Sequence, residues 1–395
     1  MLKPYRELLR VPHLGPILFL SVLGRVHATG ASLALTFLVV SWTDSYALAG
    51  LVIGALTLGN GVSGPWRGRL ADRRSAPRLL TTTCLLYAAG MIAMLSLPGW
   101  AWPAAPVLAL LIGLSTPPVG PVARAAYTRL ADGNTRSAVF AAEATLFELA
   151  VMSGPLLAAL TVGLAGPRAA VGLIAALALA SVLSFAAALR RAGLGEPVPT
   201  AAGAVVTRGS VLAVPGLTPA LVAAMLLMMG FSSVNLVIIA VGRELALPAV
   251  AGALVSVWAI GSMIGGLVAG GRPGTPRYVL RMALLTAGVA ILVPALPPLS
   301  TASPLLIGVL LAVGGLAISP TVAAANQRIG ELAPADRAAE AFGWLASFTT
   351  TGTALAAPFA GWLLDTVGPA AAAGGAAVAA LIATLSALLS TRRKP

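Results

Sequence analysis

Charged residues are scarce in this chain of 395 residues: Asp, Glu, Lys and Arg together make up 9% of it. Soluble domains carry about 25% charged residues, which cover the surface of a core that stops growing near 250–300 residues. Hydrophobic residues make up 58% and the mean hydropathy is +0.94. These figures exclude a soluble globular fold and an intrinsically disordered chain, and they indicate a polytopic membrane protein.

Cysteine and histidine are almost absent. The single cysteine, Cys84, excludes a disulfide framework and a cysteine-based metal site. The only histidines are His13 and His27, and the sequence contains no His-Glu-xx-His motif and no Gly-xxxx-Gly-Lys-Ser/Thr loop. We therefore expect no metal, no organic cofactor and no hydrolysis of ATP by this chain.

Long apolar runs account for nearly the whole sequence. A helix needs about 20 apolar residues to cross roughly 30 Å of hydrocarbon. Breaks between the runs predict twelve spans, near 15–41, 47–70, 77–97, 103–128, 136–163, 168–190, 213–241, 247–270, 276–296, 302–328, 337–364 and 368–390.

Basic residues lie on one side of these spans. The ends and loops of one side contain 21 Lys and Arg residues, whereas the other side contains only Arg168 and Arg243. The positive-inside rule then places both termini in the cytoplasm, as an even number of spans requires, and we expect a bacterial inner membrane. The net charge of +13 does not indicate a nucleic-acid partner, because the arginines lie in short clusters between spans.

The chain repeats itself at a register near 202 residues. Glycine and proline pairs carry this repeat, including Gly64 with Gly266, Gly113 with Gly315, and Pro118 with Pro320. With six spans in each half, the halves have the same orientation. We expect an all-α fold of two pseudo-symmetric six-helix bundles, 1–190 and 213–395, joined by a cytoplasmic linker at 191–212.

The loop after the second span has a distinctive pattern: Gly68, three residues, Asp72, Arg73, and Arg78 after a further interval. Together with the two six-span halves, it resembles the signature of the major facilitator transporters, although Ser75 or Ala76 stands where a second glycine is usual. The resemblance implies alternating access. It also implies that Asp72 and the basic residues after it latch neighbouring helix ends on the cytoplasmic side.

A second motif lies in the fifth span, where Gly154 and Pro155 follow Ala150. It resembles the Gly-Pro motif of the drug:proton antiporters in that family, and small residues at this spacing also suit close helix packing between the two halves. The resemblance implies a monomeric multidrug or metabolite antiporter that is driven by the proton gradient.

Four charged residues fall well inside spans, where each charge costs about 2.5–3.5 kcal/mol: Arg25, Arg124, Glu143 and Glu148. Arg25 belongs to a polar helical stripe with Ser21, Thr29, Ser32 and Thr36, which predicts that it faces a cavity, whereas His27 lies on the opposite, packed face. Glu148 lies about 140° around its helix from Glu143, so we expect only one of them on a cavity face. We favour Glu148, which is nearer the midplane, as the proton carrier. Pairing of the two arginines with the two carboxylates is the alternative.

Prolines 117, 118 and 121 interrupt the fourth span, and Pro320 stands at the matching place in the tenth. Interrupted helices at equivalent positions of two halves indicate a transport site. We therefore add Asn326 and Gln327 of the tenth span, and Asn235 of the seventh, to the candidate residues.

Three functions are consistent with these residues. The first is proton-coupled efflux of drugs or small metabolites. The second is transport of organic anions by uptake or exchange, with Arg25 and Arg124 as the binding residues. The third, an intramembrane enzyme using Ser63 in Gly61–Gly64, is disfavoured because both histidines precede that serine. We therefore expect a transporter and not an enzyme.

Overall fold

A computed structural model describes residues 8, 10–196, 210–244, 248–271, 277–301 and 303–392. Within these residues all regular secondary structure is helical. Most of the predicted linker, residues 197–209, lies outside the described part of the chain. Several of the basic residues counted above also lie outside it: Lys3, Arg6, Arg208, Arg272, Arg393 and Lys394.

The first half contains seven long helices that form six spans. They are α2 (Leu14–Thr43), α3 (Tyr46–Arg73), α4 (Ala76–Ser96), α5 (Ala105–Leu114), α6 (Val119–Leu130), α7 (Gly133–Ala165) and α8 (Pro167–Arg191). A short 3-10 helix, η1 (Gly99–Ala104), leads into α5, and α5 and α6 together make the fourth span.

The second half repeats this plan. Its helices are α9 (Leu217–Glu244), α10 (Pro248–Gly270), α11 (Tyr278–Ala290), α12 (Pro304–Gly315), α13 (Ile318–Leu332), α14 (Ala338–Thr366) and α15 (Pro369–Arg392). Three short 3-10 helices, η2 (Val211–Ala213), η3 (Val293–Ala295) and η4 (Ala335–Arg337), lie between them, and α12 and α13 form the tenth span.

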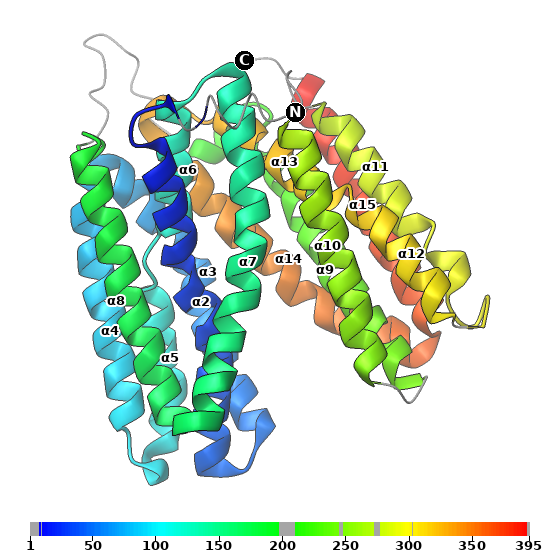
Figure 1. The fold of residues 1–395 in the computed structure, drawn as a ribbon, viewed down its shortest axis with the longest axis horizontal. Coiled ribbons are helices and arrows are strands. Elements are labelled where there is room, and N and C mark those ends of the chain that lie inside the picture. Colours follow the sequence, from blue (N-terminus) through cyan, green and yellow to red (C-terminus); the bar gives the residue numbers. More distant parts are fainter. Residues whose placement is uncertain are drawn as a thin grey trace.

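Eleven of the twelve spans are long and apolar enough to cross a membrane by length and hydropathy. The remaining span, α14, is the eleventh in chain order; it has 29 residues and crosses the same layer as the others (Figure 1). Many large apolar side chains face outward, including Leu164, Leu305 and Trp100, which are at least 80% exposed. Such a surface suits hydrocarbon and not water. The predicted fold class of twelve transmembrane helices in two bundles is confirmed.

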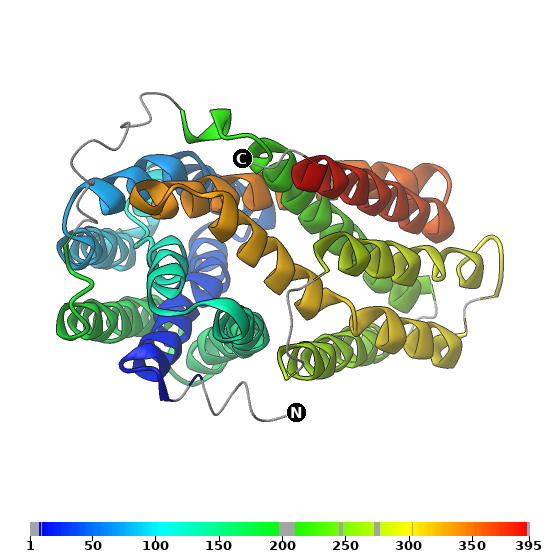
Figure 2. The same cartoon turned by 90° about the horizontal axis from the view of Figure 1, so that it is seen from above.

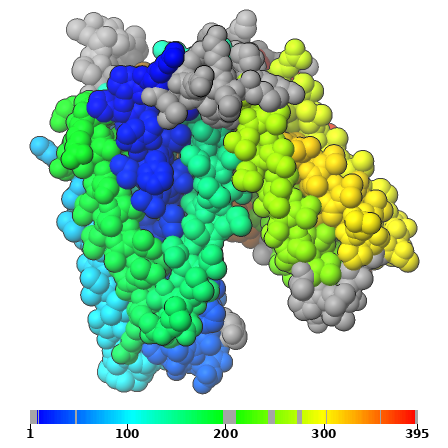
Figure 3. All heavy atoms as spheres, in the orientation of Figure 1, coloured from blue at the N-terminus to red at the C-terminus, as the bar shows by residue number. Residues whose placement is uncertain are grey.

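The two bundles lie side by side, as Figures 1 and 2 show from two directions. Both termini lie at one end of the molecule, and the bundles meet there because α14 reaches across to α3 and α6 of the first half. We call this the closed end. At the opposite end the bundles diverge, and the space-filling view shows a hollow between them (Figure 3).

The fourth and tenth spans are both interrupted near mid-depth. The helix stops at Leu114 and resumes at Val119, because Pro117 and Pro118 cannot donate backbone hydrogen bonds. In the tenth span the break lies between Gly315 and Ile318, so Pro320 occupies the first turn of α13, where a proline is tolerated. Both interruptions therefore occur at equivalent positions of the two halves.

Candidate functional site

A cavity of about 540 Å3 lies between the two bundles and receives residues from both. Its size is within the usual range for small-molecule sites. Five charged side chains line it, and all come from the first half: Arg25, Arg67, Arg124, Glu143 and Glu148. The rest of the wall is mainly apolar and includes Phe147, Val151, Leu227, Met228, Phe231 and Ile318.

Glu143 is the centre of a buried ion triad. Its Oε1 lies 2.9 Å from Nη1 of Arg25 and 3.0 Å from Nε of Arg124, and its side chain is 1% exposed. The Arg25 guanidinium also lies 4.7 Å from the centroid of the Phe147 ring, at a distance that allows a cation–π contact. Pairing offsets the desolvation of the carboxylate, so the triad is a fixed group with a net charge of +1.

Glu148 has a different environment. No salt bridge joins it to a basic residue in the described part of the chain, and its Oε1 accepts a hydrogen bond of 3.0 Å from Ser262 of α10. Since Ser262 belongs to the second half, this bond joins the two bundles at the level of the cavity. An uncompensated carboxylate in a largely apolar wall is costly while it is ionised, and a bound proton removes that cost.

The prediction that a cavity face would hold only one of these carboxylates is wrong, because both line the cavity. The prediction treated the boundary between helix and cavity as flat, so that only one face of α7 could line the cavity. Helix α7 instead lies at the junction of the bundles and contacts α2 on one side and α10 and α13 on the other. The cavity extends around it, so two residues about 140° apart both reach the cavity.

Arg67 is a cavity residue that sequence reasoning missed, since it was grouped with the basic loop after the second span. The structure buries it at 3% exposure within α3. Its Nη2 donates to Oδ1 of Asn60 at 2.8 Å, and its Nη1 donates to the carbonyl of Thr116. That carbonyl belongs to the interruption of the fourth span, so Arg67 satisfies backbone that the prolines leave without a helical partner. The sequence feature that could have identified Arg67 as a buried residue is Asn60, a polar residue seven positions earlier on the same face of the helix.

The polar stripe of the first span only partly faces the cavity. Arg25 lines it, whereas Ser21 is buried and lies 2.6 Å from the Tyr127 hydroxyl, and Thr29 donates to the Ala150 carbonyl at 2.8 Å. The stripe thus mainly joins α2 to α6 and α7. His27 is packed as expected: it is 1% exposed, and its ring lies edge-on to Tyr87 at 5.0 Å.

The three amide candidates lie in different places. Asn326 is buried and lines the cavity. Asn235 is half-buried, donates only a long bond of 3.4 Å to Phe231, and does not line the cavity. Gln327 is also outside it, because its side chain accepts from Ser137 of the first half at 2.8 Å at the closed end. Gln327 therefore holds the bundles together and is not placed to contact a molecule in the cavity.

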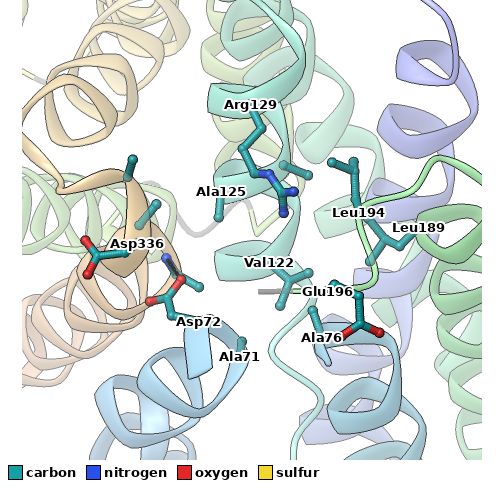
Figure 4. Close-up of a pocket in the computed structure, with 14 residues that line it drawn as sticks. Ala71, Asp72, Ala76, Val122, Ala125, Arg129, Leu189, Leu194, Glu196 and Asp336 are labelled. Carbon is teal, nitrogen blue, oxygen red and sulfur yellow. Dashed lines mark hydrogen bonds between the residues drawn. The ribbon is translucent and has the colours of Figure 1, made fainter. Parts of the chain in front are cut away.

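At the closed end, Asp72 caps the N-terminus of α14. Its two oxygens accept from the backbone N–H groups of Ala339 at 2.9 Å and Glu340 at 2.7 Å. Figure 4 shows Asp72 at the end of its helix, close to Asp336 of the second half. A carboxylate at this position is favoured by the helix dipole and by the unpaired N–H groups of the first turn. Gly68 lies one turn earlier, where a Cβ would overlap the backbone of Ala339 and Glu340.

The basic residues at this contact differ from those that the motif suggested. Arg73 and Arg78 are exposed, and no ion pair involving them is present among the described residues. Arg69 instead bonds to Oε1 of Glu340 at 2.7 Å, and Arg337 to its Oε2 at 2.8 Å. Glu340 is buried, and its pairing with Arg69 joins the two halves beside the hydrogen bonds of Asp72.

Gly154 packs inside one bundle and not between the two. A Cβ at this position would overlap Thr29, Val26 and Gly30 of α2. The expectation that the Gly-Pro motif joins the two halves is therefore wrong: Gly154 lets α7 approach α2 closely, while Pro155 continues within α7. The second half uses Gly352 of α14 in the same way against Met225 of α9.

Comparison with known proteins agrees with this architecture. The sequence profile described as "Major Facilitator Superfamily" matches residues 17–272 and 220–395. A transporter named "uncharacterized MFS-type transporter y4rN", from Sinorhizobium fredii, is 27% identical over 196 residues, which are 49% of this chain and 48% of that protein. This chain thus aligns with about half the length of that relative.

Solved structures of low sequence identity share the fold. A bacterial homologue of the iron transporter ferroportin, in an outward-facing state, has a TM-score of 0.79 at 16% identity, over 96% of this chain and 99% of that one. The E. coli fucose:proton symporter FucP has a TM-score of 0.71 at 14% identity, over 97% and 100%. With the profile match over both halves, the chain belongs to the Major Facilitator Superfamily and is a transporter.

Proposed function

We propose that this transporter exports small amphipathic molecules in exchange for protons, and that Glu148 is the proton-binding group. The observation that carries the proposal is the contrast between the two cavity carboxylates. Glu143 is bound by two arginines, whereas Glu148 has a serine hydroxyl as its hydrogen-bond partner. Two cations compensate the negative charge of Glu143, whereas no salt bridge compensates that of Glu148 among the described residues, and a bound proton would remove this uncompensated charge.

The partner of Glu148 supplies the coupling to movement. Ser262 lies in the other half, so the hydrogen bond depends on the distance between the bundles. When α7 and α10 move relative to each other, the environment of Glu148 changes, and its affinity for a proton changes with it. One proton that crosses a membrane potential of about 100 mV and a pH difference of one unit releases roughly 3.7 kcal/mol. This free energy can maintain a substrate concentration ratio of several hundredfold across the membrane.

The distribution of arginines supports an orientation in the membrane. The closed end contains almost all of the described basic loop residues, which by the positive-inside rule favours a cytoplasmic closed end. The cavity then faces the outside of a bacterial inner membrane, with both termini cytoplasmic. We propose a monomer as the working unit, as the family resemblance implies.

A second substrate class is favoured by the charge of the cavity. Three arginines and two glutamates line it, so its charged residues sum to +1 when both glutamates are ionised. This excess favours organic anions over organic cations. Protonation of Glu148 would raise the sum to +2, so a proton and an anion would bind together and travel in the same direction. Anion transport by this route is therefore symport, and not the exchange of the first proposal.

The test uses purified protein in liposomes that contain a pH-sensitive dye. Lipophilic cations, neutral drugs and organic acids are added in turn under an imposed pH gradient. Proton release on addition of cations or neutral drugs supports exchange, whereas proton uptake with acids alone supports anion symport. In either case, Glu148→Gln should abolish proton movement and leave substrate binding detectable.

Ser262→Ala is the matched companion, because it removes the hydrogen bond and keeps the carboxylate. It should retain proton-coupled transport with a shifted pH dependence. Unchanged proton-driven transport in Glu148→Gln would exclude this residue from the coupling step.

A further inference from the structure

A second cavity, of about 260 Å3, lies at the closed end of the second half, away from the central site. It is bounded by the start of α11, the end of α13 and the last turn of α15. Its wall combines the polar residues Arg277, Tyr278, Gln327, Arg328, Glu331 and Thr391 with the apolar residues Val279, Leu280 and Ala324. The proposed transport mechanism uses none of these residues, and Gln327 enters above only through its bond to Ser137 at the closed end.

Two polar atoms among these residues have no hydrogen-bond partner. The Tyr278 side chain is 94% buried, given its relative exposure of 6%, and its hydroxyl is unpaired. The Nε of Arg328 is also buried and unpaired. Its Nη2 donates to the Ser390 carbonyl at 2.6 Å, and its Nη1 lies 3.4 Å from Glu331, which fixes the guanidinium in place. Buried donors without partners are uncommon, and a ligand with several acceptor oxygens would satisfy them.

The charge of the wall indicates the sign of that ligand. Arg277 and Arg328 contribute two positive charges against the single carboxylate of Glu331, which is already bonded to Gln327 at 3.0 Å. Arg277 is exposed and has no hydrogen bond or ion pair in the described part of the chain, so its guanidinium is available. Two guanidinium groups beside a phenol hydroxyl suit a phosphate group.

The surface beside the cavity indicates the source of the phosphate. Leu280 and Leu284, one helical turn apart on α11, are 47% and 55% exposed and continue from the cavity along the apolar surface of the bundle. A small soluble anion would make no contact with these leucines, whereas the acyl chain of a lipid would cover them and bury apolar surface. Basic pockets between transmembrane helices at the membrane surface bind anionic headgroups. We propose that this cavity binds the phosphate of an anionic phospholipid, with Arg277, Arg328 and Tyr278 as its ligands.

Such a lipid would also act on the closed state. Gln327 lines the cavity and accepts the hydrogen bond from Ser137 that joins the two halves. A headgroup that holds the end of α13 in place would favour this contact. Anionic lipid should therefore increase the fraction of molecules that are closed at this end.

Native mass spectrometry of the full chain in detergent, with dioleoyl phosphatidylglycerol added, tests the proposal. Dioleoyl phosphatidylcholine, whose headgroup has no net charge, is the comparison lipid. Wild type should retain one phosphatidylglycerol in preference to phosphatidylcholine. Arg277→Gln should weaken this binding about fivefold, and the double variant with Arg328→Gln about 30-fold. Tyr278→Phe should weaken it less than either arginine change.

Arg190→Gln is the matched control, because Arg190 is exposed at the same end, on α8, and lies outside this cavity. Arg277 makes no contact on which the fold depends, so its variant keeps the test valid even if Arg328→Gln does not fold. Equal retention of phosphatidylglycerol by wild type, Arg277→Gln and Arg190→Gln would overturn the proposal. Thermal stabilisation by inorganic phosphate that equals the effect of the lipid would overturn the lipid as the source.

Discussion

Replacement of Asp72 by asparagine should shift the transporter away from the state closed at the end that bears the termini. In that state the carboxylate accepts two backbone hydrogen bonds, of 2.9 and 2.7 Å, from the first turn of α14. Asp72 lies in the first half and α14 in the second. Both bonds must therefore break when the bundles separate at this end.

The magnitude follows from these two bonds. A hydrogen bond to a charged group contributes about 1.5–3 kcal/mol, and a negative charge at a helix N-terminus a further 0.3–1 kcal/mol. The asparagine amide keeps one acceptor and loses the charge, so the closed state should lose about 2 kcal/mol. This corresponds to a change of about 30-fold in the equilibrium, which would take a 99:1 preference to about 3:1.

Spin labels at the diverging ends of the bundles can measure this shift. Leu164 at the end of α7 and Leu305 at the start of α12 are 87% and 80% exposed, and the buried Cys84 is replaced by serine. Double electron–electron resonance on the Leu164→Cys and Leu305→Cys pair should show a second, shorter distance in Asp72→Asn.

Asp365→Asn is the control. It removes the same charge from the other end of α14, where the side chain is exposed, and should leave the distances unchanged. Substrate affinity should change little, while turnover falls. If Asp72→Asn and wild type give the same distance distribution, the hydrogen bonds to α14 do not set the equilibrium.

Two further substitutions test neighbouring parts of the structure. Gly68→Ala should favour the same state as Asp72→Asn in the spin-label experiment, because its Cβ would overlap Ala339, whereas Gly61→Ala, with only ordinary contacts, should not. Glu143→Gln should lower the stability of the protein by about 3–5 kcal/mol, because it leaves two buried arginines without their shared carboxylate. Thermal unfolding in detergent measures this loss, and Glu148→Gln, which breaks no ion pair, should unfold close to wild type; equal losses would contradict the assigned pairing.

Much of the fold could be predicted from the sequence because the bilayer imposes its own length scale. An apolar run long enough to cross hydrocarbon must be helical, and Pro117 and Pro118 mark where such a helix cannot continue. The cost of a charge in hydrocarbon likewise selected Arg25, Arg124, Glu143 and Glu148 as candidate site residues, and all four line the cavity, including the second carboxylate that was not expected there.

The pairing of these residues could not be predicted, because it depends on contacts between helices that periodicity does not encode. Nothing in the spacing indicates that Glu143 forms ion pairs with both arginines, or that Glu148 instead accepts a hydrogen bond from Ser262. Arg67 was missed because its sequence neighbours are loop arginines, and a charge near a helix end has the same pattern whether it points inward or to water. The partner of Asp72, a helix N-terminus 267 residues away, has no side-chain signature at all.

The contact between α3 and α14 gives the molecule the geometry of a lever. Gly64 and Gly343 bring the two backbones together near one end of α14, and the Ser347 hydroxyl beside them donates to the Gly61 carbonyl of α3. The part of α14 from Gly343 to its last residue, Thr366, is about 34 Å long, so a tilt of roughly 10° about that contact would displace its far end by about 6 Å. A displacement of that size exceeds the width of a side chain. A small change in the angle between α3 and α14 at the closed end would therefore change the width of the opening between the bundles at the opposite end by several ångströms.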